Sequence, residues 1–156
     1  MHICVVTGSR AEYGLLRSFL HQCESDPEVC LTLVVTGAHL SPEFGFTVSD
    51  IEKDGFKISR RVELQLSSDS KVGMAKSVGL GVISFSDVLD HLRPDVCVLL
   101  GDRFEIFSVA AAAFLQGIPV AHVHGGELTI GAIDDSIRHA ITKMASIHFV
   151  AADDYR

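Results

Sequence analysis

The chain has 156 residues, of which 47% are hydrophobic and 21% are charged, and its formal net charge is −7. This composition excludes an intrinsically disordered chain, and the length is enough for a domain with a sizeable core. The acidic balance argues against nucleic acid as a partner, although an anionic ligand can still bind locally at arginines and helix N-termini.

Two features of the sequence bear on the compartment. The opening MHICVVTGS indicates a short strand, because it lacks the charged start and the long apolar core of a signal peptide. No apolar run in the sequence reaches the ~18 residues of a membrane span. The four cysteines lack metal-ligand spacing, so we expect buried free thiols in a reducing compartment. These features predict a cytoplasmic protein with no membrane partner.

Strand-like and helix-like patterns alternate along the whole chain. In chain order they predict strands at residues 2–7, 29–36, 57–66 (one or two short extended pieces), 96–100, 119–124 and 147–151, helices at 12–24, 47–54, 71–91, 104–115 and 133–145, a loop at 37–46 and a polar break at 67–70. The strands are continuous Val, Ile and Leu runs, so we expect an α/β fold: a Rossmann-like parallel sheet with helices on both faces. Helix 104–115 is apolar nearly all round and should be buried on more than one side, within the domain or in a dimer.

The loop after the first strand, residues 8–14, opens a helix. Its backbone N–H groups at Gly8 and Ser9 can receive an anion, with Arg10 as the counter-charge. An ordinary tight turn with a solvated Arg10 is the structural alternative. The loop matches neither the P-loop nor the G-x-G-x-x-G pattern, and no acid ends the second strand. Both observations argue against NAD, and we expect no cofactor.

Charged residues follow the strand at 96–100. Asp102 stands at a strand end, where a carboxylate is well placed for acid/base work, although it can also cap the next helix. The run GDRFE holds more charge than a cap needs. We therefore interpret Asp102 as catalytic and its neighbour Arg103 as substrate-binding.

The loop after the strand at 119–124 is rich in histidine and glycine. Four side chains in and beyond it have the chemistry of metal ligands: His122, His124, Glu127 and His139. The H-x-H pair on a strand would point both rings the same way. With no cysteine nearby and no second matched pair of ligands, we favour a buried histidine and a polar cleft over a metal. Gly125 and Gly126 allow a tight bend or a close approach to a ligand.

The helix at 133–145 begins with Asp134 and Asp135, where the helix dipole favours negative charge. The spacing predicts ion pairs of Asp134 with Arg138 and of Asp135 with His139. A well-charged helix alone would explain part of this pattern. Because the carboxyl ends of parallel strands meet at one edge of a sheet, however, we expect the polar residues that follow three strands to share one crevice.

Four motifs, GSRAEYG, GDRFE, HVHGGE and IDDSIRHAITK, occur in this order across essentially the whole chain. In order and spacing they resemble the hydrolysing UDP-N-acetylglucosamine 2-epimerases of sialic-acid synthesis and their relatives that act on diacetylbacillosamine. The resemblance implies that residues 1–156 form the N-terminal, Rossmann-like half of a two-domain GT-B-type fold. The nucleotide-binding C-terminal domain would then be absent from this chain, and the protein would be a homodimer or a higher homo-oligomer.

The resemblance also implies a chemistry. An enzyme of this type removes the C2 proton of the sugar and expels UDP from C1; water then adds to the glycal, which releases N-acetylmannosamine and UDP. Arg10 corresponds to the diphosphate-side arginine, and Asp102 and Asp134 to acidic residues that transfer protons or hold the sugar. His124 stands where many relatives carry glutamate, so the base stays open among Asp102, His124, Glu127 and Asp134.

The remaining candidates are assigned to substrate binding: Gly8, Ser9, Arg103, Gly125, Gly126, Arg138 and His139. Four alternatives stay open: a hydrolysing 2-epimerase for UDP-N,N'-diacetylbacillosamine, a non-hydrolysing UDP-N-acetylglucosamine 2-epimerase, a folded fragment without catalytic activity, and a metal-dependent hydrolase built on the histidines. Because half of the cleft would be missing, we expect this chain alone to be inactive.

Overall fold

A computed structural model describes residues 1–64, 70–128 and 133–155. These residues form a six-stranded parallel sheet in the order β3-β2-β1-β4-β5-β6. The strands are β1 (His2–Thr7), β2 (Cys30–Thr36), β3 (Ile58–Val62), β4 (Val96–Leu100), β5 (Val120–Val123) and β6 (Ile147–Phe149). The helices are α1 (Arg10–Ser25), α2 (Val48–Lys53), α3 (Lys71–Leu92), α4 (Phe104–Leu115) and α5 (Ile133–Met144), with short 3₁₀ turns at Gly37–Leu40, Pro42–Phe44 and Asp153–Tyr155.

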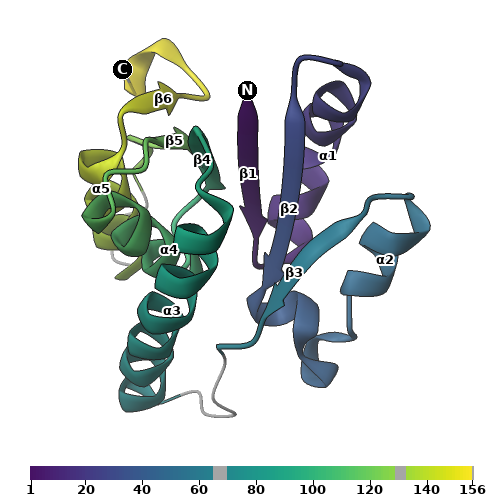
Figure 1. Cartoon of the computed structure of the whole chain (residues 1–156). Helices are drawn as coiled ribbons and strands as arrows, with labels where there is room; N and C mark the ends of the chain where they lie inside the picture. The colour runs from purple at the N-terminus through teal and green to yellow at the C-terminus, as the bar shows by residue number, and fades with distance from the viewer. Residues whose placement is uncertain (65–69, 129–132, 156) are drawn as a thin grey trace.

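The sheet separates two hydrophobic cores. Helices α1 and α2 cover one face, and α3, α4 and α5 cover the other (Figure 1). Successive strand residues face opposite sides: Cys4 and Val6 of β1 join the core of the three-helix face, whereas Ile3 and Val5 join the core under α1 and α2. The expected Rossmann-like sheet with helices on both faces is therefore confirmed.

Most boundaries agree with the sequence to within two residues, and the differences have local causes. Helix α1 begins at Arg10 because the Ser9 side chain accepts a hydrogen bond from the backbone of Glu12 and caps the helix. The expected loop at 37–46 contains two 3₁₀ turns. Of the polar break at 67–70, residues 67–69 lie outside the described part of the chain, and Ser70 caps α3.

The cysteines only partly match the expectation. All four are free, and Cys4, Cys23 and Cys97 are buried as predicted. Cys30, however, is exposed, because it begins β2 at the amino end of the sheet, where the strand is not yet covered.

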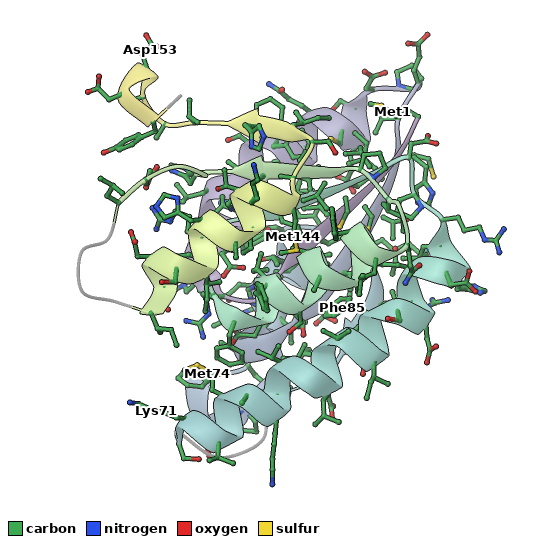
Figure 2. All side chains as sticks on the ribbon, turned by 90° about the vertical axis from the view of Figure 1, so that its left-hand side faces the viewer. Met1, Lys71, Met74, Phe85, Met144 and Asp153 are labelled. Carbon is green, nitrogen blue, oxygen red and sulfur yellow. The ribbon has the colours of Figure 1, made fainter. Side chains whose placement is uncertain are left out.

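Helix α4 lies between α3 and α5, and the three helices lie side by side in Figure 2. Its apolar surface is therefore buried within the domain. Of the two places of burial expected from the sequence, the domain or a dimer, the structure shows the first. Phe114 and Leu115, at its C-terminal end, are exposed.

Helix α3 is long and apolar enough, by length and composition alone, to cross a membrane. Here it packs as a layer of the domain. Phe85 and Leu89 are fully buried, and Phe85 lies where α3 meets α4 (Figure 2). Gly81 lies so close to Ser108 of α4 that an added Cβ would be 2.6 Å from the Ser108 side chain.

This contact leads to a prediction about α3. We expect Gly81→Ala to lower the free energy of unfolding by about 1–3 kcal/mol, because the new methyl group overpacks the contact with α4. Gly79→Ala, two residues away on the same helix, is the matched control, since its Cβ would meet nothing within 4 Å. The control should be neutral or stabilising by up to ~1 kcal/mol. Urea unfolding of both variants tests this, and equal effects at the two positions would contradict the packing.

Candidate functional site

The candidate site lies at the carboxyl edge of the sheet, between β1 and β4. From β1 the chain runs outward through β2 to β3, and it returns to β4 on the other side of β1. Ligands of open parallel sheets bind at such a switch point. The loops that follow β1, β4 and β5 carry the predicted residues Gly8–Arg10, Asp102–Arg103 and His124–Glu127.

Arg138 of α5 forms the centre of a first cluster. Its guanidinium donates hydrogen bonds from Nε and Nη2 to Oδ2 of Asp102, and from Nη1 to Oε2 of Glu127 at 2.9 Å. Arg138 is only 9% exposed. A charge buried to this extent needs close partners, and the two carboxylates provide them. The cluster thereby connects the ends of two strands to one helix.

Glu127 also contacts His124. The His124 Nδ1 lies 2.6 Å from Oε1 of Glu127. This hydrogen bond, followed by the charges of His124 and Arg138, holds the pKa of Glu127 below its usual range, although burial opposes the shift. Glu127 is therefore an ionised carboxylate at neutral pH, which only accepts hydrogen bonds, so Nδ1 of His124 carries the hydrogen of this contact.

The two histidines of the H-x-H pair have different surroundings. Strand β5 ends at Val123, and His124 takes a left-handed backbone conformation (φ 61°), so it does not continue the strand. His122 is fully buried, with Nε2 2.7 Å from the carbonyl of Gly101 and Nδ1 3.1 Å from Oγ1 of Thr142. His124 thus leaves the regular alternation of the strand, on which the expectation of two rings pointing the same way depended.

His122 is the buried, hydrogen-bonded histidine that the sequence allowed for. Burial, with smaller effects of neighbouring charges, lowers its pKa, so the ring is neutral and joins β4 to α5. Among the residues that the structure describes, no group of three His, Cys, Asp or Glu side chains could hold a metal ion.

A second cluster surrounds Arg103. Its Nε and Nη2 donate to the two carboxylate oxygens of Glu105 at 3.2 and 2.9 Å, and Nε lies 4.0 Å from Oε1 of Glu12. Burial disfavours the charged guanidinium, but Glu105, Glu12 and Asp134 together raise the pKa of Arg103. Asp134 is thus close enough to affect Arg103, although it is itself exposed at the start of α5.

Within the loop after β1, some of the hydrogen-bond donors already have partners in the chain itself. The N–H of Gly8 donates to Oε2 of Glu12 at 2.7 Å, in the place where an anion was expected. Ser9 acts as the helix cap, and Arg10 is exposed at the first position of α1. Within the described residues Arg10 makes no ion pair, so its guanidinium faces solvent. Of the backbone N–H groups that were expected to bind an anion, that of Gly8 therefore already donates to the carboxylate of Glu12.

The ion pairs of α5 only partly follow the spacing rule. Oδ1 of Asp135 lies 3.8 Å from Nε2 of His139, as expected. The described partners of Arg138, however, are Asp102 and Glu127 rather than Asp134, because those two carboxylates lie where Arg138 is buried. His139 points away from this cluster toward its own helix and is half-exposed, which separates it from the other candidates.

Sequence reasoning did not identify three buried polar residues near the site. Glu12 is 5% exposed, and its burial raises the pKa of its carboxyl from 4.5 to about 7. Glu105 is fully buried against Arg103. His39 is fully buried between Thr7 and Thr47, and this burial lowers its pKa to about 4. The position of Glu12 in the first turn of α1, shortly after Gly8, was the sequence feature that could have identified it as part of the site.

The fold and this edge define a Rossmann-like α/β domain with ionisable side chains gathered where such domains bind their ligands. The chain belongs to the UDP-N-acetylglucosamine 2-epimerase family, whose sequence model matches residues 21–156.

Two relatives and one solved structure illustrate the likeness. The GDP/UDP-N,N'-diacetylbacillosamine 2-epimerase (hydrolyzing) of Campylobacter jejuni is 49% identical over 154 residues, or 99% of this chain and 40% of that protein. The Legionella pneumophila UDP-N,N'-diacetylbacillosamine 2-epimerase (hydrolyzing) is 41% identical over 97% of this chain and 40% of its own length. The chain thus spans about 40% of the length of these relatives.

The solved structure is a UDP-GlcNAc 2-epimerase from Neisseria meningitidis bound to UDP-GlcNAc. It matches with a TM-score of 0.85 at 20% identity, over 99% of this chain and 42% of that one. This likeness shows the fold, which is that of a portion of the GT-B-type epimerases.

A first prediction concerns the buried cluster. We expect Arg138→Gln to lower the free energy of unfolding by about 3 kcal/mol, because it leaves Asp102 and Glu127 without their guanidinium. Arg93→Gln is the control: its exposed pair with Asp90 at 3.4 Å should contribute less than ~1 kcal/mol. Chemical denaturation of both variants measures the difference, and a small effect at Arg138 would refute the role of the cluster.

A second prediction concerns pH. Because the folded pKa of Glu12 is raised from 4.5 to about 7, the folded state binds the proton more tightly, and Glu12 makes the fold less stable as the pH rises through this window. Glu12→Gln removes the titration. The unfolding free energy of Glu12→Gln minus that of wild type should therefore be about 2–3 kcal/mol larger at pH 8 than at pH 5.

Urea unfolding at both pH values measures that gain. Glu24→Gln, at an exposed position of the same helix, should show no such difference. A pH-independent gain for Glu12→Gln would contradict the burial of an ionisable Glu12.

Proposed function

We propose that this chain forms the N-terminal domain of a hydrolysing 2-epimerase that acts on a UDP-linked 2-acetamido sugar. The observation that carries the proposal is the cluster of Asp102, Glu127, His124 and Arg138 at the ends of β4 and β5, beside the loop of Arg10. Family membership and the names of the hydrolysing relatives support it.

The reaction has two steps, and both are redox-neutral. A base removes the C2 proton, the electrons of the C–H bond form the C1=C2 double bond, and the C1–O bond breaks as UDP leaves with its electron pair. Water then bonds to C1 of the glycal, and C2 receives a proton on the opposite face. This chemistry requires a base, a positive field for the diphosphate and groups that guide water. We propose no cofactor for it.

His124 is the candidate base that the geometry favours. Ionised Glu127 accepts a hydrogen bond from Nδ1 and so orients the ring, in the manner of an acid–base pair in which a carboxylate positions histidine. Glu127 itself is engaged by both His124 and Arg138, which makes it a poor proton donor at neutral pH. Asp102 is held by Arg138, and it joins Asp134 as a candidate for holding the sugar or guiding water.

The diphosphate would face the loop after β1. Arg10 is exposed there, and the half-exposed Arg103 lies on the neighbouring loop after β4. Two guanidinium groups near a helix N-terminus supply the positive field that a leaving diphosphate needs. Ser9 stays a candidate for binding the diphosphate. An added Cβ at Gly125 would lie 2.7 Å from Nδ1 of His122, and one at Gly126 would lie 2.5 Å from the carbonyl oxygen of Tyr155, so these glycines allow close packing within the chain itself.

The proposed substrate class covers two sugars. UDP-N-acetylglucosamine, giving N-acetylmannosamine, is the substrate implied by the motifs. UDP-N,N'-diacetylbacillosamine is the second candidate, favoured because two relatives of 49% and 41% identity are named for it. We further propose that the complete enzyme is a cytoplasmic homo-oligomer of sialic-acid-type biosynthesis; a relative of 42% identity is the Escherichia coli polysialic acid biosynthesis protein P7.

A chimera tests the function. The chain is fused to the part of the Campylobacter jejuni relative that follows its matched segment, and each UDP-sugar is assayed for released UDP and free 2-epimeric sugar. We expect turnover by the chimera and none by the 156-residue chain alone, since these residues span only about 40% of the length of the relatives. Release of UDP by the chain alone, or an inactive chimera that is folded, would refute the proposal.

The role of His124 is tested in the same chimera. His124→Gln should lower kcat by at least ~10²-fold, the usual contribution of a general base. His91→Gln is the control, because His91 is exposed in the last turn of α3, away from the cluster, and its activity should stay within about twofold of the parent. A loss of less than about tenfold for His124→Gln would assign the base elsewhere.

A further inference from the structure

Glu12 lies between the loop that follows β1 and the guanidinium of Arg103. Its Oε2 accepts the N–H of Gly8 at 2.7 Å, and its Oε1 lies 4.0 Å from Nε of Arg103. The side chain is almost completely buried, although it belongs to the first turn of a surface helix. A carboxylate in this place is unusual, because burial of an ionised group is costly without full hydrogen bonding.

The hydrogen bonds of Glu12 are incomplete. Oε2 is satisfied by Gly8, but Oε1 is buried without a hydrogen-bond partner among the described residues. Arg103 is too far away to donate to it and gives its Nε and Nη2 hydrogens to Glu105. Oε1 is therefore a buried acceptor without a donor, and a proton bound to it would relieve the burial of charge.

Burial and the groups around Glu12 act on its carboxyl in opposite directions. Arg103 favours its ionised form and Glu105 opposes it, while the Gly8 N–H and Ser9 favour the carboxylate. Burial outweighs these effects and raises the pKa of Glu12 to about 7. His39, which contacts Thr7 at the end of β1, has a pKa lowered to about 4 by burial, so it stays neutral between pH 6 and 8. Asp134 acts on this cluster through Arg103.

We propose that Glu12 is a positioning residue that takes up a proton from solvent when a diphosphate binds at the Gly8–Arg10 loop, and that returns the proton when the diphosphate leaves. The proposal rests on the proposed function in taking a diphosphate as the group that binds there. An ionised Glu12 and a diphosphate would compete for the N–H of Gly8 and for the positive charge of Arg103. Protonation of Glu12 removes that competition and the repulsion between like charges.

The consequence for the reaction is a coupling between protonation and UDP release. With UDP bound, Glu12 is neutral and no longer repels the phosphates, while Arg103 keeps its hydrogen bonds to Glu105 and acts on the phosphates through its charge. Once UDP departs, Glu12 ionises again and holds the loop through Gly8. Glu12 needs no contact with the reacting carbons for this role, so it acts through the loop and through Arg103.

The test uses the 156-residue chain with pyrophosphate as the probe. Calorimetric titrations at pH 6 and pH 8 compare the wild-type chain with Glu12→Gln, an isosteric variant that keeps an oxygen for Gly8. Glu24→Gln is the matched control on the same helix. The two chains should bind equally at pH 6, whereas at pH 8 Glu12→Gln should bind about tenfold more tightly, since repulsion by one ionised carboxylate is removed.

Comparison of the two chains at each pH cancels the titration of pyrophosphate itself. Titrations in two buffers of different ionisation enthalpy should also show more proton uptake by the wild-type chain than by Glu12→Gln near pH 7. Equal pH dependence of the two chains, or no binding of pyrophosphate to either, would overturn the proposal.

A second measurement needs no variant. In the wild-type chain, ¹³C NMR of glutamate side-chain carboxyls follows the titration midpoint of Glu12 directly, and saturating pyrophosphate should raise it by about one pH unit or more. An unmoved midpoint would refute the coupling. Turnover by the chimera tests the epimerase function separately. An active chimera with an unchanged titration midpoint of Glu12 would refute only the coupling. A shifted midpoint with an inactive chimera would refute only the proposed function.

Discussion

The carboxyl edge of this domain depends on one buried guanidinium. Arg138 reaches from α5 to Asp102 after β4 and to Glu127 after β5, and thereby connects the loops that follow two strands to one helix. Because Glu127 in turn fixes His124, the position of the imidazole is set by a contact on another element. Removal of the guanidinium would leave two partly buried carboxylates facing each other, which explains why this residue is buried although it is charged.

A second guanidinium, on Arg103, organises the neighbouring loops in a different way. Its carboxylates, Glu105 and Glu12, outnumber it, and one of them cannot be satisfied while both are ionised. Both clusters hold two carboxylates for each guanidinium, but Arg138 donates to both of its carboxylates, whereas Arg103 donates only to Glu105 and Oε1 of Glu12 has no donor among the described residues. A carboxylate without a full set of hydrogen bonds can change its protonation when an anion binds nearby. A carboxylate whose hydrogen bonds are all made gains less free energy from such a change.

Much of the fold could be predicted from the sequence, and the site only in part. Continuous Val, Ile and Leu runs and the 3.6-residue period of the helices depend on neighbours in sequence, so they located every strand and helix named above. The partners of Arg138 could not be found in this way, because Asp102 lies 36 residues away and Glu127 lies 11 away, whereas the spacing rule for helices pointed to Asp134. The burial of Glu12 likewise follows from the packing of α1 against the loop after β4, which no local pattern encodes.

The left-handed backbone at His124 has a consequence for engineering this loop. Residues with φ near 61° are uncommon outside glycine, and histidine, asparagine and aspartate tolerate this region better than glutamate does. A relative with glutamate at this place must therefore trace a different path through the turn, or bear conformational strain. Exchange of specificity between such enzymes is best attempted by transplanting residues 122–127 as one cassette, because backbone path and side-chain identity at this corner are inherited together.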